Sequence, residues 1–321
     1  MKRRKISALK KFSKFEFMRD IMVKEIGLGI KNNKDIFFLN ADMGAPALDE
    51  VINKYPKNVI HCGISEQNMI TVGSGLALRG SKVFCYGMAP FVTARCYEQL
   101  KISLSAMNVP VCVVGIGPGL GYADAGPTHY ATEDLGIIAA LPNFNILTAA
   151  DDISCRILTK KILNSKMLSY FRIDRDAFPS VYNRKNLKYF DKSFKKGFNE
   201  IIRGNHTCII TSGYLVHKVI DYSDNLKKKK NYLGIIDLYQ HSPLNTKGLN
   251  QVLKRYKKII IIDEQVEKLG TKSILFNEIN PSLLSKIKSY SLPNKFIFEN
   301  GGRDYLLEKN GLNIKEIIKS I

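Results

Sequence analysis

The chain has 321 residues, and its 49 Lys and Arg against 29 Asp and Glu give a formal net charge of +20. Apolar residues make up 45% of it, and Gly and Pro number only 23 and 11, which excludes a disordered, fibrous or low-complexity chain. No segment approaches the roughly 20 apolar residues of a membrane span, and no apolar stretch of a secretory signal follows the basic N-terminus. We therefore expect a cytoplasmic protein of two domains with no membrane partner.

The six cysteines lie far apart and form no CxxC pair, so the sequence predicts buried thiols and neither a metal site nor a disulfide framework. The positive charge is spread along the chain and is dense only near the N-terminus and at residues 227–230. Such charge usually lies on solvated surfaces, so we do not expect a nucleic-acid partner.

The first half of the chain alternates apolar, β-branched runs with helical segments. Strands are predicted at residues 36–39, 58–62, 82–86, 109–116, 143–148 and 167–173. Between them lies, for example, a helix that Ser65 can cap at its start and that Gly80 closes. Apolar runs without strict alternation, interleaved with helices, indicate a parallel sheet covered on both faces. Residues 12–181 are therefore predicted to form one α/β domain.

The polar segment 182–196 is predicted to be a linker. A second α/β pattern fills residues 197–321, with strands expected at 206–213, 232–238 and 257–264 and a helix from residue 214. Each strand passes into a helix, which again implies parallel order. Ligands gather at the carboxyl ends of such strands, so the informative residues should follow them.

Three segments after strands carry chemistry. HCGISEQN (61–68) places Glu66 at a helix start, where the helix dipole alone could also account for it. The Gly-rich loop from Gly115 to His129 has neither P-loop nor GxGxxG spacing, and its histidine could equally be a structural hydrogen-bonder. The segment 86–99 carries Tyr86 and Phe91, for which core packing is the alternative.

In this order and spacing, the segments GISEQNM, YEQL, GPTHYATED and LPNFNILTAADD resemble the pyrimidine-binding domain of the thiamine-diphosphate-dependent transketolase family. The second half, with IITSG, GIIDLYQHSPLN and IIIIDEQ, resembles the C-terminal domain of that family. The resemblance covers residues 12–321. It implies an α/β fold of two parallel-sheet domains, a thiamine-diphosphate-binding pyrimidine-type fold followed by a C-terminal-domain-like fold.

Full-length members of the family begin with a domain whose GDG segment holds Mg²⁺ and the cofactor's diphosphate, and no GDG occurs in this chain. The resemblance therefore implies the second half of a split transketolase. We expect a partner, the N-terminal transketolase subunit with the Mg²⁺ site, in an α2β2 assembly, and self-association through both domains. The expected reaction transfers a two-carbon ketol unit between phosphorylated or modified sugars.

The resemblance also implies roles for single residues. Glu66 matches the catalytic glutamate that hydrogen-bonds the aminopyrimidine ring of the cofactor. Phe91 is the expected stacking ring, with Tyr86 nearby and Arg95 and Tyr97 as secondary cofactor contacts. The spacing to Gln99 is shifted by about one residue relative to the family.

On the substrate side, His129 matches the histidine of the GPTH motif, which faces the sugar hydroxyls near the reacting carbon. Arg19 and Arg172 match arginines that clamp the substrate phosphate, which a guanidinium fork can bind through two bonds. A surface arginine is the alternative for Arg19.

Two departures from the family pattern bear on the substrate. The residue before the GPTH motif (126–129) is usually Asp, whereas here it is Ala125, and Asp124 lies one position earlier. A second histidine usually lies twelve residues before the first, where this chain has Gly117. These changes indicate a sugar other than the usual pentose phosphates.

Other interpretations stay open. The β subunit of a 2-oxo acid dehydrogenase has a similar length and domain order, and a 1-deoxyxylulose-phosphate synthase-like enzyme is a weaker fit. From a different class, a non-catalytic scaffold could keep the same fold. Retention of Glu66 argues against a scaffold, because an inactive relative has no physical need for the carboxyl group.

Overall fold

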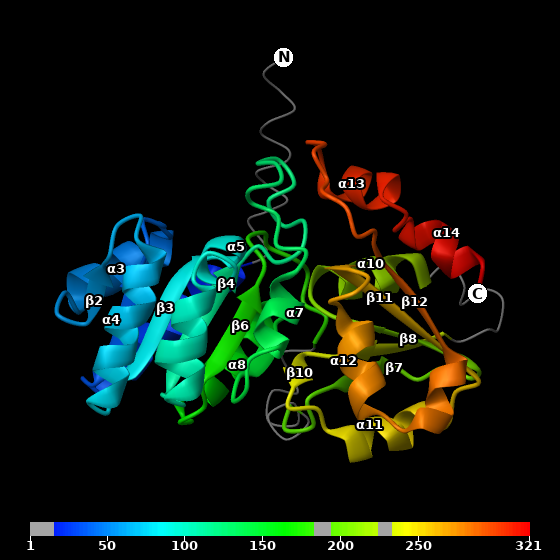
Figure 1. The fold of residues 1–321 in the computed structure, drawn as a ribbon, viewed down its shortest axis with the longest axis horizontal. Helices are drawn as coiled ribbons and strands as arrows, with labels where there is room; N and C mark the ends of the chain where they lie inside the picture. The colour runs from blue at the N-terminus through cyan, green and yellow to red at the C-terminus, as the bar shows by residue number, and fades with distance from the viewer. Residues whose placement is uncertain (1–15, 183–193, 224–232) are drawn as a thin grey trace.

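The computed structural model describes residues 16–182, 194–223 and 233–321, and it contains two α/β units that lie side by side (Figure 1). The first unit is built on a seven-stranded sheet and the second on a five-stranded sheet. None of the described helices is long and apolar enough to cross a membrane. All six cysteines are free, and all but Cys62 are buried.

The first sheet has the strand order β10-β5-β6-β4-β3-β1-β2, and its strands are parallel except for β10. The strand bounds are β1 Ile36–Asn40, β2 Val59–His61, β3 Lys82–Met88, β4 Val111–Ile116, β5 Asn145–Thr148, β6 Ser169–Ile173 and β10 Gln240–Ser242. The six strands predicted from the apolar runs are all present.

Helices cover both faces of this sheet, as their apolar residues divide into two core clusters. One cluster joins the sheet to α2 (Met18–Asn32), α3 (Pro46–Lys54) and α8 (Asp152–Leu163). The other joins it to α4 (Glu66–Leu78), α5 (Ala89–Val92), the π-helix η1 (Leu100–Ala106) and α7 (Asp134–Ala139), and the short helix α6 (Tyr97–Gln99) precedes η1. Neighbours along a strand alternate between the clusters, as Phe84 and Cys85 do, because side chains of a strand point to opposite faces.

The second sheet has the order β12-β11-β8-β9-β7, with β7 antiparallel to β9 and the other pairs parallel. Its strands are β7 Asn199–Ile202, β8 Thr207–Thr211, β9 Gly234–Asp237, β11 Lys258–Val266 and β12 Ile287–Leu292. The helices are α10 Tyr214–Ser223, α11 Thr246–Leu253, α12 Thr271–Glu278, η4 Pro281–Lys286, α13 Arg303–Lys309 and α14 Ile314–Lys319. One core cluster contains residues of α10, α13 and α14, and the other contains residues of α11 and α12.

Two details differ from the sequence-based expectation. Edge strands β7 and β10 are antiparallel, so the sheets are mostly rather than wholly parallel. Strand β10 comes from the second half of the chain yet pairs with β5 of the first sheet, so the first sheet is completed across the domain boundary. Most of the expected linker 182–196 lies outside the described residues, while two of its described residues, Tyr182 and Phe194, are buried with their rings 5.1 Å apart.

Candidate functional site

Glu66 begins helix α4 at the carboxyl edge of the first sheet, directly after β2. The chain turns there through Gly63, whose φ of +67° lies in the left-handed region that favours glycine. Ser65 occupies the N-cap position, but its side chain makes no capping bond, so the predicted Ser65 cap is wrong. A carboxylate in the first turn is favoured by the helix dipole. The predicted end of the helix is confirmed, because Arg79 is the C-cap and Gly80 follows with φ +97°.

The Glu66 carboxylate is buried and bonded to Arg95, which in turn lies against Phe91. Only 5% of Glu66 is exposed, and Arg95 Nη1 donates to its Oε2 over 2.8 Å. The Arg95 guanidinium lies over the Phe91 ring, 4.1 Å from its centroid. The Phe91 ring also meets the His129 ring edge to face, with the centroids 5.2 Å apart. The structure thus brings together four of the predicted site residues.

Tyr86 does not join this group. It is fully buried in β3, on the sheet face opposite Glu66's helix, with its ring 5.4 Å from Phe38. Its hydroxyl has no hydrogen-bond partner among the described residues. Burial raises the pKa of this phenol, and the positive charge of Arg19 acts on it in the opposite sense. Tyr86 is therefore neutral, and its described ring neighbour is Phe38.

The segment between Phe91 and Gln99 is irregular. Helix α5 ends at Val92, turns occupy 93–96, and the π-helix η1 follows α6. Cys96 Sγ lies 3.1 Å from the carbonyl oxygen of Phe91, and Gln67 Nε2 donates to the carbonyl oxygen of Arg95 over 3.1 Å. The Gln67 bond ties the turn to α4, and the Cys96 contact lies within the segment 91–96.

The Gly-rich loop folds back on itself around Tyr122. Gly117 has φ +71°, and a Cβ atom there would lie 2.4 Å from Cε2 of the Tyr122 ring. Tyr122 thus fills the space that a side chain at position 117 would need. Its ring lies 6.0 Å from the His129 ring and 4.8 Å from the guanidinium carbon of Arg175.

Asp124 holds Arg175 in this position. Arg175 Nη1 and Nη2 donate to the two carboxylate oxygens of Asp124 over 2.7 and 3.3 Å. The hydrogen bond with Arg175 is the main cause that lowers the pKa of the Asp124 carboxyl. Tyr122, Asp124 and Arg175 thus form one cluster of interacting side chains. The sequence motifs point to Asp124 only as a displaced residue, and they carry no signal for Tyr122 or Arg175.

Arg19 lies in α2, and its positive charge acts to lower the pKa of Tyr86 and of Tyr122, against the larger effect of their burial. Its Nε is buried and makes no hydrogen bond among the described residues, although it lies 3.9 Å from Asp20 Oδ1 in an ion pair, and its guanidinium lies 5.2 Å from the Phe17 ring centroid. A buried guanidinium nitrogen without an acceptor is costly unless a ligand or water supplies one. This nitrogen is therefore available to an anionic or polar group at the carboxyl edge.

Arg172 lies in β6 and is buried in a different network. Its Nε and Nη2 donate to the two oxygens of Asp134 over 2.8 and 3.1 Å, and its Nη1 donates to Thr148 Oγ1 over 3.1 Å. Tyr170 and Gln265 also donate to Asp134, over 2.7 and 2.8 Å. All three guanidinium nitrogens of Arg172 are thus used within the protein.

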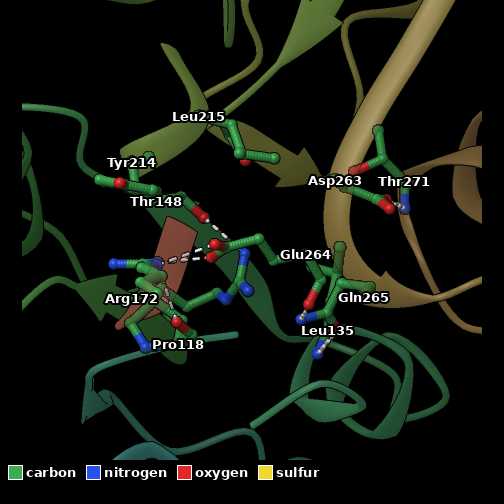
Figure 2. Close-up of a pocket in the computed structure, with 13 residues that line it drawn as sticks. Pro118, Leu135, Thr148, Arg172, Tyr214, Leu215, Asp263, Glu264, Gln265 and Thr271 are labelled. Carbon is green, nitrogen blue, oxygen red and sulfur yellow. Dashed lines mark hydrogen bonds and ion pairs between the residues drawn. The ribbon is translucent and has the colours of Figure 1, made fainter. Parts of the chain in front are cut away.

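A second buried network lies beside it, between the two units. Arg303 Nε donates to Glu264 Oε1 over 2.8 Å, and Arg303 Nη1 bonds Asp174 in the first unit. The guanidinium of Arg303 also lies 4.0 Å from the Tyr214 ring centroid. Figure 2 shows the small pocket that both networks line, with Arg172, Thr148, Glu264 and Gln265 around it.

Metal ligands are not gathered in the part of the chain that the structure describes, where no group of three or more His, Cys, Asp or Glu is placed to hold an ion. The site as it is described consists of one buried carboxylate, an aromatic ring, one histidine and several arginines. This set can bind a flat nitrogen-containing ring and an anion.

Comparisons with known proteins agree with this architecture. The family model described as "Transketolase, pyrimidine binding domain" matches residues 18–180, and "Transketolase, C-terminal domain" matches residues 199–317. The B-type subunit of apulose-4-phosphate transketolase from Phocaeicola vulgatus is 25% identical over 288 residues, which cover 88% of this chain and 90% of that protein. Transketolase of Homo sapiens is 26% identical over 218 residues, which cover 66% of this chain and 34% of that protein.

A solved structure, "Split gene transketolase, inactive beta4 tetramer", has the same fold. Its TM-score is 0.80 at 22% identity, and the match covers 94% of this chain and 96% of that chain. The two α/β units, their order and the family matches therefore agree with the resemblance found in the sequence. The chain belongs to the transketolase family, of which it carries the pyrimidine-binding and C-terminal domains in the manner of the second half of a split transketolase.

Proposed function

We propose that the chain is the C-terminal subunit of a split, thiamine-diphosphate-dependent transketolase that moves a two-carbon ketol unit between sugar phosphates. The observation that carries this proposal is the buried Glu66 carboxylate at the carboxyl edge of the first sheet, beside Arg95, Phe91 and His129. We place the diphosphate and Mg²⁺ on an N-terminal transketolase subunit, the partner in an α2β2 assembly in the cytoplasm.

The residues around Glu66 fit the aminopyrimidine end of the cofactor. Glu66 offers a carboxylate that is held by the start of α4 and that few water molecules can reach, so it can share a proton with a ring nitrogen. Phe91 is half-buried and offers a flat surface beside that carboxylate. When bound, the cofactor supplies the carbon nucleophile that accepts the two-carbon unit.

His129 would act on the substrate side. Thr128 Oγ1 lies 2.9 Å from His129 Nδ1, which fixes the imidazole on its loop and leaves Nε2 for a ligand. A histidine in this position can bond a sugar hydroxyl and can move its proton near the reacting carbon. Because the His129 ring contacts the Phe91 ring, it would lie next to an aminopyrimidine ring that stacks on Phe91.

We assign the anionic end of the substrate to Arg19 and Arg175. Arg19 has a buried Nε that makes no hydrogen bond in the described structure and only a 3.9 Å ion pair with Asp20, and Arg175 is partly exposed beside Tyr122. The family resemblance suggests Arg172 for this task. Because the Asp134 carboxylate already takes two nitrogens of Arg172, we propose that Arg172 holds the site together and that Arg175 meets the phosphate.

The substrate itself is proposed to be a modified sugar phosphate. The family usually has a hydrogen-bonding histidine at position 117, whereas here Tyr122 fills the space beside Gly117. The part of the sugar that this histidine would bond would therefore contact the Tyr122 ring. The relative from Phocaeicola vulgatus carries apulose 4-phosphate in its name, which makes that compound the first to test.

Reconstitution tests the proposal. The chain should be co-purified with an N-terminal transketolase subunit from the same source and titrated with thiamine diphosphate in the presence of Mg²⁺. We expect binding by the pair, ketol transfer from a sugar phosphate, and a loss of at least about 100-fold in kcat for Glu66→Gln. The solved relative with the same fold is described as an inactive β4 tetramer, so we expect no turnover from this chain alone. Absence of cofactor binding by the pair, or normal turnover of Glu66→Gln, would refute the proposal.

A further inference from the structure

Arg95 makes both contacts that the cofactor's aminopyrimidine ring would make. We infer that its side chain fills the aminopyrimidine place in the free chain and must swing into solvent before the cofactor can bind. The inference rests on the proposed function of Glu66 and Phe91, and it assigns Arg95 a role opposite to that of an ordinary cofactor contact.

The geometry of the Arg95 guanidinium resembles that of a bound ring. It is planar, it donates to Glu66 Oε2 over 2.8 Å, and its carbon lies 4.1 Å from the centroid of the Phe91 ring. A flat group that donates to the carboxylate and stacks on the phenyl ring is also what the cofactor would present. Both groups cannot hold the same carboxylate oxygen and the same ring face at once.

The difference in burial shows which partner can move. The Glu66 side chain is 6% exposed, whereas the Arg95 side chain is 42% exposed. Glu66 is further fixed by its place in the first turn of α4. Arg95 can therefore rotate into water and keep its charge solvated, while a displaced Glu66 carboxylate would have to leave its helix turn.

The backbone around Arg95 limits the motion to its side chain. Gln67 Nε2 holds the Arg95 carbonyl oxygen, and the Cys96 thiol lies against the Phe91 carbonyl oxygen. Both bonds involve main-chain atoms of the turn and none involves the guanidinium. The turn can thus remain in place against α4 when the ion pair between Arg95 and Glu66 opens.

The ion pair also explains how the free chain tolerates Glu66. A carboxylate that is nine-tenths buried needs a charged or hydrogen-bonding partner, because an unpaired buried charge is costly. Before the cofactor arrives, Arg95 is the one side chain among the described residues that bonds this carboxylate. Once the exchange is complete, the cofactor ring replaces Arg95 as the partner of Glu66.

The affinity for thiamine diphosphate distinguishes an Arg95 that competes with the cofactor from an Arg95 that helps to bind it. The chain paired with an N-terminal transketolase subunit should be titrated with thiamine diphosphate at constant Mg²⁺ by isothermal calorimetry, as wild type, Arg95→Ala and Arg95→Gln. We expect both variants to bind roughly tenfold more tightly, since loss of a competitor worth about 1.4 kcal/mol changes an equilibrium constant tenfold. Arg95→Lys keeps the charge but not the planar fork and should fall between them and wild type.

Arg79→Ala is the matched control. It removes the same charge at the other end of α4, where Arg79 is exposed, and it should leave the affinity unchanged. Stopped-flow mixing gives a second readout, because a competitor that must leave slows cofactor association and its removal should speed it.

The outcomes separate the inference from the proposed function. If the wild-type pair does not bind thiamine diphosphate, the proposed function fails. If it binds in a manner that depends on Glu66, while Arg95→Ala and Arg95→Gln bind with unchanged or weaker affinity, the competitor role of Arg95 alone is overturned and Arg95 is a cofactor contact. Tighter binding by both variants, with the control unchanged, supports it.

Discussion

The pH dependence of stability should depend strongly on Asp237, a carboxyl group that is completely buried where the two units meet. Asp237 is the last residue of β9, and Tyr182, from the end of the first unit, donates to its Oδ2 over 2.5 Å. Its Oδ1 is buried without a hydrogen-bond partner in the described structure. Desolvation is the main cause that raises the pKa of Asp237 from 3.8 to about 7, while the Tyr182 bond acts in the opposite sense and the charge of Asp151 adds to the rise.

The sign follows from proton linkage. Because the folded protein binds this proton more tightly than the unfolded chain, the contribution to stability is full below pH 3.8 and is lost as the pH rises to about 7. The difference between a pKa of 3.8 in the unfolded chain and about 7 in the folded protein corresponds to roughly 4 kcal/mol, which is the largest loss of stability expected from this group. Asp237→Asn carries no charge and keeps an oxygen that can accept from Tyr182, so it should escape this loss.

The assay is urea unfolding of wild type and Asp237→Asn at several pH values from acid to mildly basic. We expect the two proteins to have similar free energies of unfolding at the acid end and the variant to be more stable above the pKa of about 7. The exposed Asp35→Asn is the matched control and should follow wild type throughout. A difference between wild type and Asp237→Asn that stays constant with pH would contradict the reasoning, because it would mean that Asp237 does not titrate in this range.

Three further changes test the site and its supports. Gly117→Ala should lower the free energy of unfolding by about 1 kcal/mol or more, because φ is +71° and the new Cβ would clash with the Tyr122 ring. Measured by urea unfolding, the loss should be smaller when the same change is made in a Tyr122→Ala protein. Arg303→Ala should lower the free energy of unfolding by about 3–5 kcal/mol, because it leaves the carboxylates of Glu264 and Asp174 buried without their cation. Urea unfolding measures the loss, and an equal loss in the exposed control Lys309→Ala would contradict this assignment. Arg175→Lys should raise KM for the sugar phosphate severalfold with little change in the free energy of unfolding, whereas Arg172→Lys should lower that free energy. The reverse pattern in kinetics and in unfolding would mean that Arg172, and not Arg175, binds the phosphate.

The central strands could be predicted from sequence because they are buried on both faces. Runs such as IFFL and VCVVGI are apolar throughout, which is typical of a parallel strand covered by helices. Among the edge strands, β2 could still be predicted from its apolar run, but β7, β10 and β12 carry no such signal. Strand β12, with the sequence IKSYSL, is only partly buried, and the three-residue strand β10 pairs with β5, which lies far earlier in the chain. Pairing over such a separation is a tertiary effect that local patterns do not contain.

The candidate site divides in the same way. The motifs predict Glu66, Phe91, Arg95 and His129 as site residues, and the structure places these four side chains in contact, while their roles stay predictions. They point to Arg172, near the end of an apolar run, and give no signal for Arg175, which follows three residues later. The side-chain alternation of β6 turns Arg172 toward Asp134, while Arg175 lies beyond the strand, next to Tyr122. A choice between two arginines so close in sequence requires the partner carboxylates, and these come from distant loops.

The contacts between the units give the C-terminal domain a role in the site even though it contributes none of the residues grouped around Glu66. Its residues hold the Gly-rich loop just after His129. Gln265 Nε2 donates to the carbonyl oxygen of Ala131, and the backbone of Val266 donates to that of Thr132. Tyr130 in turn donates to the carbonyl oxygen of Glu299 over 2.7 Å.

The position of His129 therefore depends on the second sheet as much as on the first. A loop with several glycines has many accessible conformations, and main-chain bonds from a neighbouring sheet restrict it at little cost in side-chain entropy. Since Gln265 also bonds Asp134, the network that buries Arg172 and the bonds that hold the histidine loop share one residue. A change that loosens the interface at Gln265 should thus displace His129 and reduce turnover without touching any group that meets substrate. In this way, the packing of the two domains and the geometry of the proposed site are parts of one structure.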